Sequence, residues 1–227
     1  MSYDPSRVAV AILTKNQAAG IAGIVEAIRP YTSELLVVDG HSEDDTQAEA
    51  RRHGATVVVD GGRGKGDGVR AAIQAATREV LVMLDGDGSY AIGDIPALAG
   101  PVLANDADLV IASRMRGGSD QDHGTIGAAV RMFGNAGLSV LINSRFGTSL
   151  TDSQNGFRAL RREAAAGLRL VECGTAIELE LPLALLRRGY RVAEVPSHEY
   201  PRRFGTTSLD LRRDWFPLLR CLLKHLP

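Results

Sequence analysis

The stretch Val80-Leu81-Val82-Met83-Leu84-Asp85-Gly86-Asp87 places two carboxylates, one residue apart, at the end of a continuous apolar run. The run predicts a buried strand, and glycines at 86 and 88 allow the backbone to turn sharply behind it. Carboxylate oxygens are the ligands that hard divalent cations prefer, and such a cation can neutralise a departing diphosphate. An acidic surface turn is the alternative, because Asp and Gly are common turn residues. The rest of the chain must decide between the two.

Four further apolar runs predict strands, and the segments between them predict helices. These strands are expected at residues 8–13, 35–38, 57–59 and 109–112. Asn16 is expected to cap the first helix, Glu43-Asp44-Asp45 to form the first turn of the second, and the third to run over about 69–76. Such alternation predicts an α/β fold with a mostly parallel, Rossmann-like sheet and helices on both of its faces.

Several polar residues follow the ends of these predicted strands. Asp39 ends the second strand, a glycine-rich loop with Lys65 follows the third, and Arg114 follows the fifth. Sheets of this kind bind ligands beyond the carboxyl ends of their strands. We therefore expect these side chains to form one site with Asp85 and Asp87, which favours the functional interpretation of the acidic pair.

The second half of the chain is less regular. We expect a mobile loop at 115–125, helices at 126–143 and 176–188, strands at 155–160 and 191–195, a polar loop at 200–207 and a last helix at about 209–224. Gly189 is a natural end for the second of these helices. No linker or repeat is visible, so we expect one domain over 1–227.

Composition excludes several other classes of protein. A net charge of −1 over 227 residues argues against a general nucleic-acid binder, and two distant cysteines imply neither disulfides nor a cysteine-based metal site. The longest stretch without a charged residue has thirteen residues, fewer than the roughly 20 that span a bilayer. No signal peptide is visible at the start. A cytoplasmic protein is expected, with contact at the inner face of the membrane left open.

The glycine-rich loop does not fit the common nucleotide motifs. A Walker loop needs Ser or Thr after its lysine, and Lys65 is followed by Gly66. A dinucleotide fingerprint would follow the first strand, where Thr14-Lys15-Asn16-Gln17 stands instead. The sugar nucleotidyltransferases carry a glycine-rich basic loop at that same place, so that class is disfavoured too.

Five motifs in order resemble a known family. They are Val37-Val38-Asp39-Gly40-x-Ser42-x-Asp44-Asp45-Thr46, Gly64-Lys65-Gly66, Leu84-Asp85-Gly86-Asp87, Asp152-x-x-x-Gly156-Phe157-Arg158 and Arg202-x-Phe204-Gly205. Together they resemble the family 2 glycosyltransferases of GT-A fold, in particular the dolichyl- or polyprenyl-phosphate mannosyl- and glucosyltransferases. The resemblance implies an enzyme that moves a sugar from a GDP- or UDP-linked donor, with inversion, to a polyprenyl phosphate. It also implies a nucleotide-sugar-binding half at about 7–114 and an acceptor half at about 115–227.

The resemblance also implies roles for individual residues on the donor side. Asp39 corresponds to the acid that contacts the nucleotide base, and Thr14 and Asn16 lie beside it after the first strand. Asp85 would lie near the ribose or the metal, and Lys65 would add positive charge near the phosphates. Asp87 would hold Mg2+ or Mn2+ against the diphosphate, with Asp85 and Ser89 as further expected ligands.

On the acceptor side the resemblance assigns phosphate binding to arginines. Arg202, with Arg203 beside it, corresponds to the arginine that binds donor or acceptor phosphate from a mobile loop, and Arg114 matches an acceptor-phosphate position. Guanidinium groups suit phosphate because they stay charged and present paired donors. A phosphate acceptor needs positioning rather than a base, whereas a hydroxyl acceptor needs its proton removed. Asp152 is the candidate base, and a cap that shapes the loop at 156–158 is the alternative for it.

Three departures from the family pattern leave the acceptor open. Gln17 replaces an acid, Ser89 stands where lipid-phosphate members often carry Gln, and Thr207-Ser208-Leu209 replaces Ser-Lys-Leu. A glycosyltransferase of the same fold that acts on a soluble small molecule or natural-product intermediate is therefore the alternative. A non-catalytic nucleotide-sugar binder is a third hypothesis, which the intact Asp-x-Asp disfavours.

Two features of the predicted helices complete the expectations. Glu178 and Glu180 lie two residues apart and should point to different faces, one of them into solvent; the family favours an acid here. The last helix places Leu211, Trp215, Leu218 and Leu222 on one stripe, with basic residues mainly elsewhere. That stripe predicts either peripheral contact with an anionic membrane or packing on the domain or on a second subunit, as in a homodimer.

Overall fold

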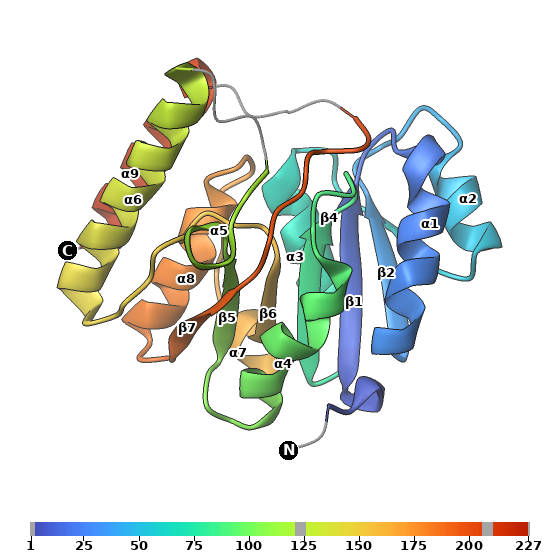
Figure 1. The fold of residues 1–227 in the computed structure, drawn as a ribbon, viewed down its shortest axis with the longest axis horizontal. Coiled ribbons are helices and arrows are strands. Elements are labelled where there is room, and N and C mark those ends of the chain that lie inside the picture. The colour runs from blue at the N-terminus through green and yellow to red at the C-terminus, as the bar shows by residue number, and fades with distance from the viewer. Residues whose placement is uncertain (1–2, 121–125, 206–210, 227) are drawn as a thin grey trace.

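A single seven-stranded sheet forms the centre of the protein, seen in a computed structural model (Figure 1). The structure describes residues 3–120, 126–205 and 211–226, and their side chains outside 126–133 and 211–214. Its strands are β1 (Val8–Thr14), β2 (Glu34–Asp39), β3 (Thr56–Val59), β4 (Val80–Asp85), β5 (Leu109–Ser113), β6 (Arg158–Arg161) and β7 (Val192–Pro196).

The sheet is mostly parallel, as the alternating pattern predicts. Its strand order is β3-β2-β1-β4-β6-β5-β7, and only β6 runs against its neighbours within the described residues. Strand β6 comes from the second half of the chain and lies between β4 and β5 of the first half. The carboxyl ends of β1, β2, β4 and β5 therefore lie at one edge, which is the upper edge in Figure 1.

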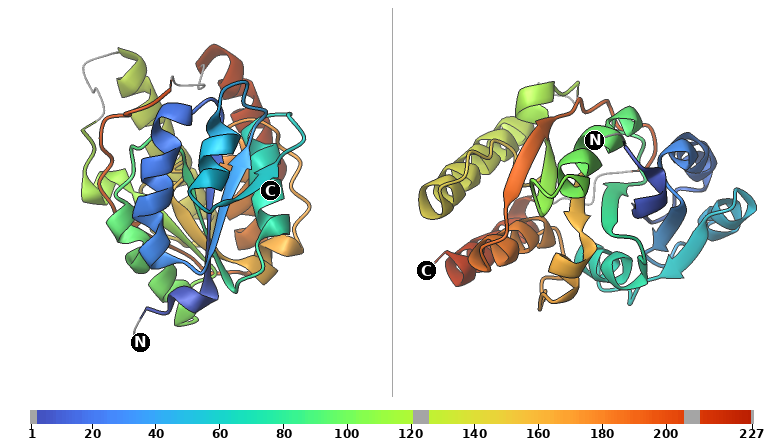
Figure 2. Two further views of the ribbon diagram at one scale, coloured as in Figure 1. Left: turned by 90° about the vertical axis from the view of Figure 1, so that its right-hand side faces the viewer. Right: turned by 90° about the horizontal axis from the view of Figure 1, so that it is seen from below.

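Helices cover both faces of this sheet, as the views from the side and from below make plain (Figure 2). The helices are α1 (Ala18–Ile28), α2 (Thr46–Arg52), α3 (Lys65–Ala75), α4 (Ile95–Leu103), α5 (Arg114–Gly117), α6 (Ile126–Phe146), α7 (Arg162–Ala166), α8 (Ile177–Arg187) and α9 (Leu211–His225). Short 3-10 turns η1 (Pro5–Arg7), η2 (Arg29–Tyr31) and η3 (Ile92–Asp94) complete the elements.

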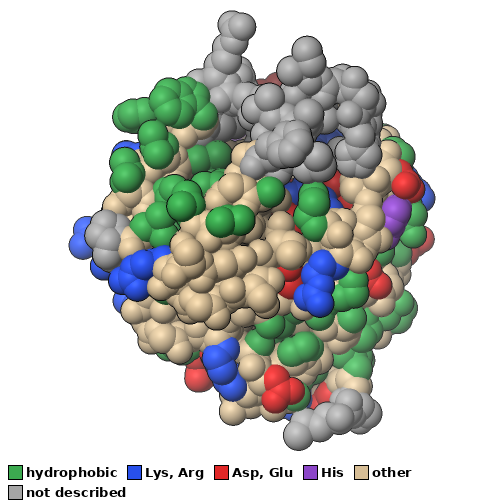
Figure 3. Space-filling view, turned by 60° about the vertical axis from the view of Figure 1, so that its left-hand side comes forward, with side chains coloured by type: hydrophobic (Ala, Val, Ile, Leu, Met, Phe, Trp, Pro, Cys, Tyr) green, Lys and Arg blue, Asp and Glu red, His purple; other side chains and the backbone are tan. Residues whose placement is uncertain are grey.

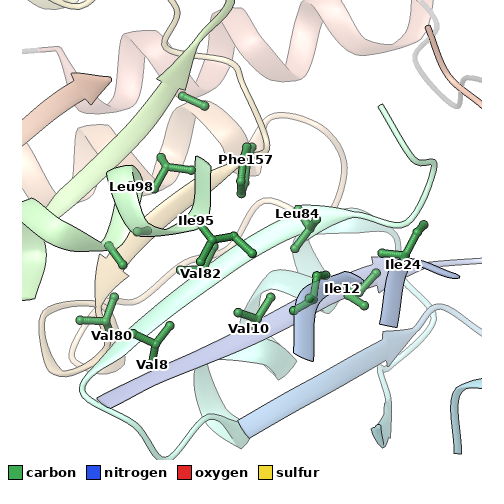
Figure 4. Close-up of a cluster of buried hydrophobic side chains, with 14 of the residues drawn as sticks. Val8, Val10, Ile12, Ile24, Val80, Val82, Leu84, Ile95, Leu98 and Phe157 are labelled. Carbon is green, nitrogen blue, oxygen red and sulfur yellow. The ribbon is translucent and has the colours of Figure 1, made fainter. Parts of the chain in front are cut away.

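The alternation of side chains along β1 produces two separate cores. Val8, Val10 and Ile12 point to the face covered by α1 and α4, where Figure 4 shows them among buried aliphatic side chains. Ala9 and Ala11 point to the other face, under α3, α7 and α8. Successive residues of a strand face opposite sides, so a strand that is apolar at every position is required for a sheet covered on both faces.

A third apolar cluster holds the C-terminal helix. Leu218 and Leu222 of α9 pack with Ile142 of α6 and with Leu179 and Leu183 of α8. The packing alternative for the last helix is therefore confirmed for these two leucines. Trp215, predicted on the same stripe, does not pack on the domain, because it is 56% exposed.

Three expected helix starts differ from the structure. Asn16 does not cap α1, because its side chain accepts from the Glu43 backbone N–H. The N–H groups at the start of α1 donate instead to the side chains of Thr46 and Asp44, in the segment after β2. Helix α2 starts at Thr46, after the acidic residues expected in its first turn. Helix α3 starts at Lys65, four residues before the expected 69, because Gly64 adopts a φ of 106° that a side chain would oppose.

Two other expectations concern the second half. Helix α8 ends as predicted: Gly189 has a φ of 79°, and the N–H groups of residues 189 and 190 return to the carbonyls of Leu186 and Leu185. The expected mobile loop at 115–125 is wrong at its start, where residues 114–117 form α5. Residues 121–125 and 207–209 lie outside the described residues.

Candidate active site

The Asp-x-Asp loop leaves β4 in a tight turn against β1. The Gly86 N–H donates to the Leu13 carbonyl at 2.8 Å, and a Cβ at position 86 would lie 3.0 Å from Thr14 Oγ1. Gly88 then adopts a φ of 75°. A residue with a side chain is disfavoured at both positions. The two glycines therefore allow the acidic loop to turn back over the edge of the sheet.

Asp87 is buried in this loop and is held on both oxygens. Its Oδ1 accepts from the Ser89 backbone N–H at 3.0 Å and from the Ser89 hydroxyl at 2.6 Å. Its Oδ2 lies 3.3 Å from Nε of Arg202. Ser89 is 1% exposed, and the hydrogen bond from its hydroxyl orients the Asp87 carboxylate.

Residues 199–205, called the strap below, cross over the Asp-x-Asp loop. The strap is fixed by its backbone, since the N–H groups of Arg203 and Phe204 both donate to the Asp87 carbonyl at 3.0 and 3.1 Å. The Phe204 ring lies against α1 at Gly20, where a Cβ would overlap the ring. The strap therefore delivers Arg202, from the end of the chain, to the carboxylate that follows β4.

Lys65 lies at the first position of α3 and is neutralised by two carboxylates. Its Nζ lies 2.8 Å from Asp85 and 2.8 Å from Glu178 of α8. Burial by itself lowers the pKa of Lys65, but the two carboxylates outweigh it, and the pKa is raised. Glu178 also pairs at 2.5 Å with Arg158, whose side chain is 1% exposed.

These ion pairs correct the expectation for the two acids of α8. Glu178 is 6% exposed and Glu180 is fully buried, so neither is solvated. They do point to different surroundings: Glu180 accepts the backbone N–H groups of Val171 and Glu172. Their partners come from distant parts of the chain, which the helical spacing does not indicate.

Asp85 faces a compact polar cluster. It accepts from Lys65 at 2.8 Å and from the Tyr90 hydroxyl at 3.2 Å. Burial, and then the charges of Asp85 and Asp87, raise the pKa of Tyr90. A Cβ at Gly156 would lie 2.9 Å from Lys65 Nζ and 3.2 Å from Asp85, so the glycine of the Asp152 motif leaves room for this cluster.

Arg114, which is partly buried, and Asp152, which is fully buried, form an ion pair beside the strap. Arg114 Nε and Nη2 donate to the two Asp152 oxygens at 2.6 and 2.8 Å, and Asn135 of α6 donates to Oδ1 at 2.6 Å. Burial raises the pKa of Asp152, but Arg114 outweighs it and holds the pKa below its usual range. This arrangement favours a structural function for Asp152, which anchors Arg114 rather than the 156–158 loop.

Glu199 is a site residue that sequence reasoning missed. Its carboxylate lies 3.7 Å from Arg114 Nη1 and accepts from the Ser119 hydroxyl at 3.1 Å. Burial raises the pKa of Glu199, and Arg114 opposes that shift. The signal that could have found it is its position three residues before Arg202, on the segment that the resemblance describes as a loop over the donor.

The expected nucleotide-base residues lie at the neighbouring strand ends. Asp39 is fully buried and accepts from the Ser42 hydroxyl and N–H and from Gln47 Nε2, at 2.5, 2.9 and 2.7 Å. Asn16 adopts a φ of 54° and accepts from the loop after β2. The Thr14 hydroxyl is buried and has no hydrogen-bond partner within the described residues, directly beside Gly86.

The structure thus brings the candidate residues to one edge of the sheet. Asp85 pairs with Lys65 and Asp87 pairs with Arg202, Arg114 and Asp152 lie beside them, and Thr14, Asn16 and Asp39 follow along β1 and β2. Arg203 lies in the strap with an exposed side chain. No group of three or more His, Cys, Asp or Glu that could hold a metal occurs in the described part of the chain. A cation here would need ligands from phosphate, and Mg2+ commonly takes one or two carboxylates plus substrate phosphates.

Comparisons with known proteins agree with this arrangement. A family model described as "Glycosyl transferase family 2" matches residues 9–168. The chain belongs to this family and is a glycosyltransferase. The resemblance drawn from the five motifs is therefore confirmed.

Two relatives from Haloferax volcanii illustrate the similarity. The chain is 34% identical over 213 residues to glycosyltransferase AglJ, covering 92% of this chain and 69% of the relative. It is 32% identical over 211 residues to a dolichyl-phosphate hexose transferase, covering 92% of this chain and 88% of the relative.

Among solved structures, a glucosyl-3-phosphoglycerate synthase from Mycobacterium tuberculosis shares the fold. Its complex with Mn2+ and UDP-glucose superposes with a TM-score of 0.74 at 24% identity, covering 97% of this chain and 79% of the other. The fold is GT-A, as the sequence motifs indicated.

Proposed function

We propose that the protein transfers a hexose, with inversion, from a GDP- or UDP-linked donor to a polyprenyl phosphate. One observation carries the proposal: the Asp87 carboxylate beyond the end of β4 meets Arg202 of the strap at 3.3 Å. A diphosphate with its cation needs both an anionic ligand for the metal and a guanidinium for its oxygens. The two groups stand together at the edge where sheets of this kind bind nucleotides.

The residues present fit a divalent cation bound jointly with the donor. Asp87 supplies hard oxygen and Ser89 orients it, whereas Asp85 would contribute only if Lys65 released it. When bound, Mg2+ or Mn2+ supplies charge to the leaving diphosphate. Arg202 would turn from Asp87 to the donor phosphates, and Thr14, Asn16 and Asp39 would line the nucleoside side.

A phosphate acceptor is favoured by the engagement of Asp152. A hydroxyl acceptor requires a free carboxylate within hydrogen-bond reach, and both Asp152 oxygens are taken by Arg114 and Asn135. A phosphate monoester is ionised near neutral pH and needs cations to position it. Arg203 and Arg114 are the candidates, and the name of the 32% identical dolichyl-phosphate hexose transferase supports a lipid-linked acceptor.

A small-molecule acceptor is the second candidate function. It is favoured by Ser89, which is buried under Asp87 where lipid-phosphate members often carry Gln. In that case Glu199, whose pKa is raised by burial, is a carboxylate near the site that could accept a proton. A pure nucleotide-sugar binder is the third candidate.

The proposal is tested by transfer assays with purified protein. GDP- and UDP-hexoses are offered with Mn2+ or Mg2+ and either a short polyprenyl phosphate or a panel of soluble alcohols. We expect lipid-linked product that depends on the metal, and Asp87→Asn should lower turnover about 100-fold, or about 2.7 kcal/mol. Asp106→Asn, an exposed residue in the turn before β5, is the matched control.

Different outcomes separate the three candidates. Unchanged turnover in Asp87→Asn would remove Asp87 from the metal site. Products formed only from alcohols would replace the lipid acceptor by a small molecule. Calorimetry that shows tight donor binding with no transfer to any acceptor would indicate a binder.

A further inference from the structure

The C-terminal helix α9 has three different faces. Leu218, Cys221, Leu222 and His225 are buried or half-buried against α6 and α8. At about 100° per residue, Trp215, Phe216, Leu219 and Leu223 fall within an arc of about 100° on a second face. Arg220 and Lys224 follow on a third. The helix therefore has apolar residues in excess of those needed to attach it to the domain.

The second face is apolar and open to solvent. Trp215, Phe216, Leu219 and Leu223 are 56, 61, 40 and 64% exposed. On the neighbouring α6, Val140 is 65% and Leu141 is 45% exposed. Figure 3, which looks toward this side of the molecule, shows hydrophobic side chains gathered near its upper left, with basic ones along the same edge. Large apolar side chains gathered in the open on one side of a protein mark an interaction site.

The charges around this face are predominantly positive. Helix α9 contains four Arg or Lys and one Asp in its sequence. Arg187 and Arg145 are exposed beside it, with their guanidinium groups on the carbonyls of Lys224 and Leu226. The nearby acids Glu172 and Glu180 are buried. Glu172 pairs with Arg220 at 2.8 Å and Glu180 lies 3.8 Å from Lys224, so the positive charge in excess of these pairs comes from Arg145 and Arg187 among the described side chains. A partner for this surface must be apolar in part and negatively charged.

We propose that this face of α9 binds the surface of an anionic lipid bilayer. Amphipathic helices with Lys and Arg beside large apolar side chains lie in the bilayer interface, and Trp is favoured at that depth. Anionic headgroups attract the basic residues at the rim. A second copy of the chain would instead bring the same positive charges together, which disfavours a symmetric dimer through this face. No helix among the described residues is long and apolar enough to cross a bilayer.

Binding through α9 would bring the candidate active site close to the lipid. The first residues of α9 lie at the upper end of the molecule in Figure 1, the end where β1 and β4 finish. Six residue steps separate Gly205 of the strap from Leu211, so their Cα atoms are within about 21 Å. A lipid-linked acceptor would then present its phosphate near Arg202. The inference deepens the proposed function, but lipid binding itself needs neither donor nor acceptor.

The single tryptophan of the chain is the reporter for this inference. Trp215 is the one Trp in the sequence and lies on the proposed face. The intact protein, without donor or metal, is titrated with vesicles of phosphatidylglycerol and phosphatidylcholine, and with vesicles of phosphatidylcholine alone. We expect Trp emission to move to shorter wavelength only with the anionic vesicles, and salt should weaken binding. Brominated lipid should quench the emission.

Variants distinguish this face from others. Phe216→Ser combined with Leu223→Ser removes exposed side chains only, and should weaken vesicle partitioning at least tenfold. Val59→Thr, an exposed residue on β3 at the opposite edge of the sheet, is the control and should bind as the unmodified protein does.

Three results would overturn the inference. The first is no change in emission with anionic vesicles at low salt, and the second is equal binding to the uncharged vesicles. The third is a wavelength shift that follows protein concentration without lipid and accompanies dimers in sedimentation, which would assign the face to a second copy. Each is independent of whether sugar transfer is detected, so failure of the proposed function would be recognised separately.

Discussion

Glu178 is the residue whose replacement tests the structure most directly. Its carboxylate lies between two cations, at 2.5 Å from Arg158 and 2.8 Å from Lys65. Glu178→Gln keeps the size of the side chain and removes the charge. Lys65 then still has Asp85 as an ion-pair partner. Arg158 has no other carboxylate partner within the described residues, and only its hydrogen bonds to the carbonyls of Asn155 and residue 178 remain.

The size of the effect follows from burial. The Arg158 side chain is 1% exposed and that of Glu178 is 8% exposed, so solvent screens the pair little. Breaking a buried pair by removing one partner costs about 3–5 kcal/mol, because the remaining charge is buried without compensation. Gln retains one acceptor oxygen, so we expect a loss near the lower end, about 3 kcal/mol. In a chain of this length that lowers Tm by about 10 °C.

Urea unfolding followed by circular dichroism measures this loss. Glu163→Gln, an exposed glutamate on α7, is the matched control and should change stability by less than about 0.5 kcal/mol. Glu178→Leu with Arg158→Met should recover most of the stability, because an apolar pair of similar volume needs no charge compensation. A loss below about 1 kcal/mol in Glu178→Gln, at unchanged m value, would refute the buried network.

Two further predictions concern the strap and the ion pair of Arg114 and Asp152 beside it. Gly20→Ala should displace the Phe204 ring, because a Cβ at position 20 would overlap it. Trypsin should then cut the strap faster after Arg203, while the free energy of unfolding changes by less than about 1 kcal/mol. Equal cleavage rates in the variant and the unmodified protein would contradict this. Asp152→Asn should make the free energy of unfolding fall less steeply as the pH is lowered. Arg114 lowers the pKa of Asp152 in the folded protein, so the ionised Asp152 stabilises the fold above about pH 4, and this stabilisation is lost as the pH falls through the folded pKa. Urea midpoints between about pH 7 and about pH 2.5 measure it, and an acid limb as steep as that of the unmodified protein would refute the assignment.

The position of the candidate site could be predicted because it depends on local patterns. Apolar runs that end in Asp39 and Asp85 define strand ends, and parallel strands bring their carboxyl ends to one edge. The strap was recognised by resemblance, since Arg202-x-Phe204-Gly205 has no local signal for its contact with Asp87. Its place became visible only with the backbone hydrogen bonds from Arg203 and Phe204 to Asp87.

Pairings between distant charges could not be predicted in the same way. Lys65 was expected near the donor phosphates, and nothing in its own segment indicates that it lies between Asp85 and Glu178. Asp152 was predicted as a base or a loop cap, and its ion pair with Arg114 is not indicated by the residues around either of them. Each pairing is decided by which helix packs against which strand end, and a pattern of residue types within one segment carries no information on that packing.

The sequence alone therefore determined the class of fold, the edge of the sheet that carries the site and the family, because periodicity and motif order are properties of the chain. Only the tertiary structure decided where β6 enters the sheet, how Glu178 and Glu199 join the site, and which side of α9 is left exposed. The physical reason is that strand pairing, burial of charge and the choice between two apolar faces of one helix are set by contacts between segments far apart in the chain. Asp85 and Asp87 show both contributions. Their position at the end of a strand was predicted from the pattern of residues, but their different partners, Lys65 and Arg202, are set by packing.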